Sequence, residues 1–174
     1  MLELLPHSEF DAVFAIMEQS FPADEYRPHH EQRALLEKDE YRLYVCKEQG
    51  SICAFIAMWQ FEGLCYIEHF AVSPQKRNGG LGSKMLSEAV ALSQNPVCLE
   101  VEPPENDLCK RRIAFYERNG FFFNDYPYTQ PPISKGKSPV PLRIMTTGGR
   151  VTKQKFEYIR HTLYTKVYGF SEVE

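Results

Sequence analysis

Apolar residues recur along this chain with two different periods, and the change between them separates helices from strands. From Ser8 to Gln19 the apolar residues share one face at helical spacing, so we expect a helix there with Ser8 as its cap and Asp11 completing a capping box. Other stretches are continuously apolar or alternate with period two, and glycine or proline ends them, which is typical of strands. Strands are predicted at 41–47, 51–61, 64–72, 96–101, 121–126 and 142–147.

The helical period returns between several of these strands. Gly120 stands where a helix ending near Asn119 needs a left-handed cap. A surface loop is expected at 23–30 and an irregular proline-rich segment at 127–141. No repeat or linker interrupts the pattern, which predicts one mixed α/β domain over residues 1–174. Helices are predicted at 31–38, 80–95, 106–119 and 152–167.

Composition and charge narrow the class of protein. The chain is 43% hydrophobic and 25% charged, which is typical of a globular domain. Its formal net charge of −3 argues against a nucleic-acid or membrane partner, and no apolar stretch approaches the roughly 18 residues of a membrane span. The start of the chain does not resemble a secretory signal, and five cysteines without a CxxC pair predict neither disulfides nor a metal site. We therefore expect a cytoplasmic protein.

The most informative segment is Phe70–Ser83, with the sequence FAVSPQKRNGGLGS. A strand runs into a proline, then a basic and glycine-rich turn, and then a helix. Glycines let backbone amides approach a ligand closely, and a helix start adds unpaired amides and the positive end of the dipole. These features together predict a site for a pyrophosphate-sized anion, to which Lys76 and Arg77 add positive charge.

Two common nucleotide motifs do not fit this turn, and a plain strand-to-helix turn is the alternative to a binding site. A Walker loop needs a lysine after its last glycine, and none follows Gly82 in that frame. A dinucleotide fingerprint needs a third glycine where Met85 stands, and it opens its domain, whereas strands precede this turn.

Two motifs resemble those of the GNAT N-acetyltransferase family. Arg77-x-x-Gly80-x-Gly82 is similar to the family's [QR]-x-x-G-x-[GA] pyrophosphate signature, and it follows an apolar-Ala-Val strand end at 70–72. Further on, the segment AFYERNGF at 114–121 resembles the family's later motif, with a tyrosine four residues before Gly-Phe. The resemblance is specific over about residues 66–121.

The resemblance implies both a fold and a cofactor. The fold would be an α/β GNAT-type fold, with a mixed, mostly antiparallel sheet, a splayed pair of parallel strands and helices on both faces. Acetyl-CoA would be the co-substrate, with its pantetheine arm along 70–72, its pyrophosphate on the turn and its thioester between strands 68–72 and 97–101. The implied cofactor contacts are Phe70, Ala71, Val72, Arg77, Asn78, Gly79, Gly80, Leu81, Gly82, Ser83, Cys109 and Tyr116.

One position departs from the family pattern. The family often has an asparagine about seven residues before the motif tyrosine, and this chain has Cys109 there, with Asn106 as the nearest asparagine. A backbone contact to the cofactor is compatible with cysteine at this place, whereas the side-chain contact of the family is not.

Acetyl transfer to an amine needs a base for the ammonium and an acid for the departing thiolate. If its strand is regular, alternation places Glu68 on one face and His69 on the other. Glu68 is the first candidate base, with a solvated strand-edge carboxylate as the alternative, and His69 is the second, with a packed histidine as the alternative. Glu100 and Glu102 form a further acidic pair, with binding of a cationic acceptor or plain solvation as alternatives. The resemblance implies that Tyr116 is the acid, because a phenol can donate to the CoA sulfur. A backbone amide near Val72 would polarise the thioester oxygen.

Three functions remain open on the sequence. The first is an acetyltransferase acting on a primary amine of a small molecule or peptide, as a monomer or homodimer. The second is a non-catalytic acyl-CoA-binding regulatory domain with the same fold, and the third is a structural protein whose glycine turn binds nothing. The resemblance implies that the loop at 127–141 borders the acceptor together with the loop at 23–30, and a solvated hairpin is the alternative for 127–141.

Overall fold

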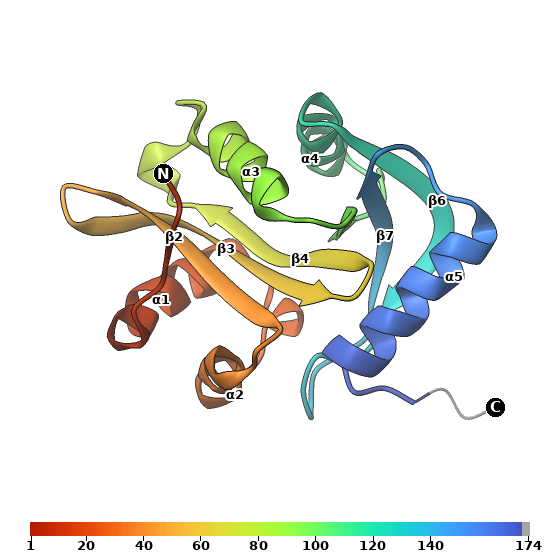
Figure 1. The fold of residues 1–174 in the computed structure, drawn as a ribbon, viewed down its shortest axis with the longest axis horizontal. Coiled ribbons are helices and arrows are strands. Elements are labelled where there is room, and N and C mark those ends of the chain that lie inside the picture. The colour runs from red at the N-terminus through yellow and green to blue at the C-terminus, as the bar shows by residue number, and fades with distance from the viewer. Residues whose placement is uncertain (172–174) are drawn as a thin grey trace. The chain divides into compact units, whose positions relative to one another are not determined.

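The computed structural model describes residues 1–171 and divides the chain into two compact units. The first unit is Met1–Val97, and the second begins at Cys98. Within each unit the strands pair antiparallel, and each unit, with its own helices, is described separately below (Figure 1). The prediction of a single domain stays a prediction.

The sheet of the first unit has the order β1-β2-β3-β4, with antiparallel pairing throughout. The predicted bounds of β3 and β4 are confirmed, and β2 runs one residue beyond its predicted end. The two-residue strand β1 was not expected, and its brevity leaves no periodic pattern in the sequence. The strands are β1 (Glu3–Leu4), β2 (Tyr41–Glu48), β3 (Ser51–Phe61) and β4 (Leu64–Val72).

Helices cover both faces of this sheet. Helix α1 (Phe10–Ser20) and helix α3 (Leu81–Leu92) lie on opposite sides of β2–β4 (Figure 1). The predicted Ser8 cap is wrong, because Pro6 begins a 3-10 turn over His7–Glu9 and α1 starts only afterwards. The amide of Glu9 is bonded to the Pro6 carbonyl at 2.9 Å, so the backbone itself forms the entry to the helix.

The second helix of this unit is shorter and earlier than predicted. Helix α2 spans His29–Ala34 rather than 31–38, and a 3-10 turn over Leu35–Glu37 continues it. Pro28 precedes its first residue, and proline is well suited to the start of a helix because the first amides have no partner there. The segment 21–28 joins α1 to α2 and includes a 3-10 turn at Ala23–Glu25.

The second unit has a sheet in the order β5-β7-β6, again antiparallel. The prediction that 127–141 is irregular is wrong at both ends. Strand β6 continues through Pro127, where its pairing with β7 is interrupted between Asn124 and Tyr128. A proline is tolerated at that point because β6 is the last strand of this sheet. The strands are β5 (Val97–Val101), β6 (Phe121–Gln130) and β7 (Val140–Thr147).

Two helices complete the second unit. Helix α4 (Asp107–Arg118) begins at the cap Asn106, whose side chain accepts the amide of Cys109 at 2.9 Å. Helix α5 (Lys153–Thr162) packs Phe156 against Tyr126 of β6, with 4.8 Å between ring centroids. A π-helical turn over Leu163–Val167 follows α5 where one continuous helix was predicted. Within residues 1–171, no helix is long and apolar enough to cross a membrane.

Gly120 provides a test of local backbone strain. Its φ is 86°, and an added Cβ would meet no atom within 4 Å, so Gly120→Ala adds left-handed strain without a steric clash. We expect the variant to lose about 1 kcal/mol of unfolding free energy, measured by urea denaturation.

Gly79→Ala is the matched control, because Gly79 lies outside the left-handed region and its nearest atom to a new Cβ is the Lys76 oxygen at 4.0 Å. It should be near neutral. Equal losses of unfolding free energy in the two variants would show that the left-handed conformation of Gly120 does not cause the loss.

Candidate functional site

The turn between β4 and α3 presents backbone amides to solvent. After a 3-10 turn at Pro74–Lys76, residues 77–80 are exposed. Asn78 and Gly80 have φ values of 67° and 78°, a conformation that asparagine and glycine adopt most readily. Gly80 is the N-cap of α3 and provides no side-chain cap, so the first amides of this helix stay available for an anion.

Positive charge at this turn comes from Arg77. Lys76 is paired with Glu48, with 2.5 Å between Nζ and Oε2, so much of its charge is compensated locally. Arg77 instead donates its Nε–H to the backbone carbonyl of Val72 at 2.9 Å. This hydrogen bond fixes the Arg77 side chain beside the turn. Because a carbonyl carries no net charge, the positive charge of Arg77 is not compensated by this bond.

The strand before the turn is anchored beneath α3. Phe70 and Val72 pack against a buried cluster in which Met85 of α3 meets three residues of β2 and β3. Ala71, between them, is buried. The residues predicted to contact the cofactor at 70–72 and 77–83 therefore belong to one continuous strand–turn–helix segment with a packed base.

A β-bulge interrupts β4 at Glu68. His69 pairs with Ala57 of β3 and Ile67 pairs with Met58, so Glu68 has no opposite residue. The expectation that Glu68 and His69 lie on opposite faces is therefore wrong, because the extra residue breaks the alternation. Both side chains reach the segment that joins α1 to α2.

Glu68 forms a buried ion pair with Arg27 from that segment. Arg27 Nη1 lies 2.8 Å from Glu68 Oε1, and the two side chains are 6% and 1% exposed. The alignment is not that of a hydrogen bond, and neither carboxylate oxygen has a hydrogen-bond partner within residues 1–171. The positive charge of Arg27 thus compensates the carboxylate, whose oxygens can still accept hydrogen bonds from another donor.

His69 is held in one tautomer beside this carboxylate. Its Nε2 lies 2.7 Å from the backbone oxygen of Glu25, and because a carbonyl only accepts, Nε2 carries the proton. Burial lowers the pKa of His69 from its ordinary value of 6.5, so the ring is neutral near pH 7. Its Nδ1 is then a buried acceptor, 3.6 Å from Glu68 Oε2 and without a hydrogen-bond partner in the described chain.

A second layer of buried polar groups surrounds Arg27. The side-chain oxygen of Gln32, on α2, accepts the Arg27 amide at 3.3 Å, and the Gln32 amide donates to Tyr41 Oη at 3.3 Å. Burial is the largest cause that raises the pKa of Tyr41, and the negative charge of Glu68 adds to it. Tyr41 therefore stays a neutral phenol, and Glu68 is the only anion that these contacts place at Arg27.

Tyr116, the candidate acid, lies in the second unit on α4. Its ring packs edge-on against Phe115 and Phe121, at centroid distances of 5.3 and 5.9 Å. Burial raises the pKa of Tyr116 to about 12, so the phenol keeps its proton at neutral pH. No other group in residues 1–171 is hydrogen-bonded to its hydroxyl, which leaves that proton available to a ligand.

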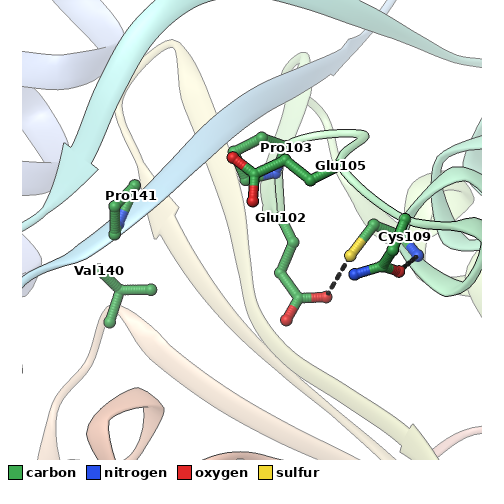
Figure 2. Close-up of a pocket in the computed structure, with 7 residues that line it drawn as sticks. Glu102, Pro103, Glu105, Cys109, Val140 and Pro141 are labelled. Carbon is green, nitrogen blue, oxygen red and sulfur yellow. Dashed lines mark hydrogen bonds between the residues drawn. The ribbon is translucent and has the colours of Figure 1, made fainter.

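Cys109 lies at a small cavity of about 240 Å³ (Figure 2). Its thiol donates to Glu102 Oε2 at 3.2 Å, and Arg112 donates to the same oxygen at 2.6 Å. Burial raises the pKa of the Cys109 thiol, which makes it a poor nucleophile. The backbone N–H of Cys109 already donates to the Asn106 side chain, so a cofactor contact at Cys109 would have to replace one of these hydrogen bonds. The cavity is lined by Glu102, Pro103, Glu105, Asn106, Cys109, Val140 and Pro141.

Glu100 and Glu102 do not act as a pair. Tyr128 donates to Glu100 Oε1 at 2.5 Å, and the Tyr168 hydroxyl lies within 3.0 Å of both carboxylate oxygens. Glu102 is engaged by Arg112 instead, on the side of α4. The structure thus gives each carboxylate its own internal partners.

Sequence reasoning missed Arg27, which was placed in a surface loop and is only 5% exposed. An arginine in a polar segment next to Pro28 has no sequence feature that marks it as buried.

His29 and His30 match the surface expectation, with side chains 45% and 81% exposed. All five cysteines are buried free thiols. The described residues contain no group of three or more potential metal ligands, and the prediction of no metal stays a prediction.

Comparison with known proteins gives a consistent family. Residues 39–121 match the family model of the acetyltransferase (GNAT) domain. A solved structure from Bacteroides thetaiotaomicron, assigned to the GNAT acetyltransferases, is 32% identical over 98% of this chain and 99% of that one, with a TM-score of 0.87. No curated protein sequence gives a significant match.

More distant structures share the fold. A variant of the spermidine N-acetyltransferase from Vibrio cholerae is 12% identical, covers 84% of this chain and 94% of its own, and has a TM-score of 0.64. The ribosomal-protein-S18-alanine N-acetyltransferase from Escherichia coli is 18% identical, covers 84% and 92%, and has a TM-score of 0.63. The predicted α/β GNAT-type fold is confirmed, and the chain belongs to the GNAT family of acetyltransferases.

Proposed function

We propose that this protein transfers the acetyl group of acetyl-CoA to a primary amine of a small molecule or a peptide. The observation that carries the proposal is the exposed turn of the strand–turn–helix segment, with left-handed Asn78 and Gly80 and an uncapped α3, in a chain of the GNAT family. Proteins of similar fold are named as N-acetyltransferases of spermidine and of a ribosomal protein's alanine, which supports proposing an acceptor that is a small or a peptide amine.

The amine attacks the thioester directly in a ternary complex. A carbon–nitrogen bond forms, the carbon–sulfur bond breaks, and the amine loses a proton while CoA gains one. Backbone amides at 77–83 bind the pyrophosphate, and the strand at 70–72 binds the pantetheine arm in the manner of an added strand. Cys109 and Tyr116 complete the proposed cofactor contacts, and an amide near Val72 polarises the thioester oxygen.

Glu68 is the proposed proton acceptor, directly or through one water. Its oxygens lack hydrogen-bond donors within residues 1–171, and the neutral Nδ1 of His69 lies beside Oε2 as a second acceptor. A water or amine with two N–H or O–H groups satisfies both atoms at once. Tyr116 is the proposed acid, since its raised pKa keeps the phenol protonated until the thiolate leaves.

A non-catalytic acyl-CoA-binding domain is the alternative, and it predicts binding without turnover. The expected cytoplasmic location and the monomer or homodimer state stay predictions.

Replacing the proposed base tests the chemistry. Glu68→Gln keeps the size of the side chain and removes its basicity, so kcat should fall at least about 10²-fold. Release of CoA thiol is measured with a panel of primary amines at saturating acetyl-CoA. Glu117→Gln, at an exposed position of α4, is the control and should keep the wild-type rate. A Glu68→Gln variant with wild-type kcat would refute the base role.

Replacing the proposed acid tests the leaving-group step. Tyr116→Phe removes one hydroxyl and keeps the ring contacts with Phe115 and Phe121, so kcat should fall about 10²-fold with little change in stability. Tyr158→Phe, on the exposed side of α5, is the control. Tight acetyl-CoA binding by the wild type without thiol release for any amine would instead favour the regulatory domain.

The neutral state of His69 predicts a pH-dependent stability. An unfolded chain takes up a proton at His69 near pH 6.5, whereas the folded protein does so only at lower pH because burial lowers this pKa. The unfolding free energy should therefore fall as the pH falls below about 6.5, by at most about 1.4 kcal/mol per pH unit.

Urea denaturation at several pH values between about 7 and about 5, a range that includes the ordinary histidine pKa, measures how the unfolding free energy changes with pH. His69→Gln should flatten this slope, whereas His30→Gln, at a side chain that is 81% exposed, should not. An unchanged slope in His69→Gln would mean that His69 is not held neutral.

A further inference from the structure

The ion pair between Arg27 and Glu68 has no evident purpose in stability alone. Removing two charges from water costs more than their attraction often returns, and apolar residues of similar volume commonly stabilise a core as well or better. Yet this pair lies at the bulge of β4, the place where the strand departs from regular pairing. A buried charge at an irregular strand position points to a role beyond packing.

The geometry of the pair gives the two carboxylate oxygens different surroundings. Arg27 Nη1 lies at 2.8 Å from Oε1, whereas His69 Nδ1 lies at 3.6 Å from Oε2. The cation therefore fixes one oxygen and leaves the other directed toward the neutral acceptor of His69.

The same contacts attach the segment 21–28 to the bulge. Arg27 reaches Glu68, the Glu25 carbonyl accepts from His69 at 2.7 Å, and the ring of Phe21 packs on His69 at 4.9 Å. Gln32 holds the Arg27 backbone from α2. The connection between α1 and α2 is thus held to β4 at several points around the carboxylate.

From this arrangement we infer that Arg27 is a positioning residue, which holds the Glu68 carboxylate oriented for its role in proton transfer. The inference rests on the proposed function, since it assigns Arg27 a role through Glu68. Arg27 makes no contact with substrate in this assignment. It acts on the direction of the carboxylate, and it links the segment 21–28 to that carboxylate.

Variants of Arg27 in the full-length protein test the inference. Arg27→Met removes the charge and keeps much of the volume, so kcat should fall about as far as in Glu68→Gln, about 10²-fold, with acetyl-CoA affinity changed less than about threefold. Arg27→Lys keeps the charge and should recover at least about tenfold of that loss. Arg42→Met is the matched control, a half-buried arginine of β2 that bonds a backbone carbonyl.

The number of acetyl-CoA sites separates positioning from a general loss of structure. In calorimetric titration, Arg27→Met should bind acetyl-CoA with the wild-type number of sites and still turn over slowly, because only the direction of the Glu68 carboxylate has changed. A variant that is only less well folded loses acetyl-CoA sites in proportion to its loss of kcat.

The double variant Arg27→Met/Glu68→Gln completes the test and addresses folding. Because Glu68→Gln removes the unpaired charge, the double variant should fold even where Arg27→Met does not, and its kcat should equal that of Glu68→Gln. Additive losses, or wild-type kcat in Arg27→Met beside a slow Glu68→Gln, would overturn the positioning role and leave the proposed function intact. Wild-type kcat in Glu68→Gln would remove the base role and the inference with it.

Discussion

The arrangement of the first unit depends on one buried ion pair at one irregular strand position. A bulge in β4 turns Glu68 to the same side as His69, and burial there is possible because Arg27 supplies the opposite charge at 2.8 Å. Breaking such a pair by removing one partner typically costs about 3–5 kcal/mol, since it leaves an uncompensated charge. The connection between α1 and α2, the bulge and the tautomer of His69 are consequently fixed together.

Most of the regular fold could be predicted because apolar periodicity and turn residues determine it. The bounds of β3 and β4 followed from the glycines at positions 50 and 63, and the predicted start of α4 was within one residue of the observed one. The start of α1 was wrong because a 3-10 turn after Pro6 has no distinct apolar period. Strand β6 was cut short because Pro127 ends most strands, although an edge position tolerates it.

One part of the candidate site could be predicted from the sequence and another part could not. The glycine-rich turn is local in sequence, so its left-handed residues and uncapped helix could be anticipated from the order of residues alone. The partners of Glu68 could not, because Arg27 is more than one helix and two strands away along the chain. Strand alternation also failed there, since one inserted residue reverses the side on which the following side chains lie.

The turn between β4 and α3 is the proposed binding site of acetyl-CoA. Calorimetric titration of the protein with acetyl-CoA, and with free CoA for comparison, measures this directly, beside a Gly80→Trp variant that places a bulky side chain at a left-handed residue with φ of 78°. The wild-type protein should bind both ligands, because they share the pyrophosphate, and the variant should bind neither. Binding of neither ligand by the folded wild-type protein would contradict the proposed site.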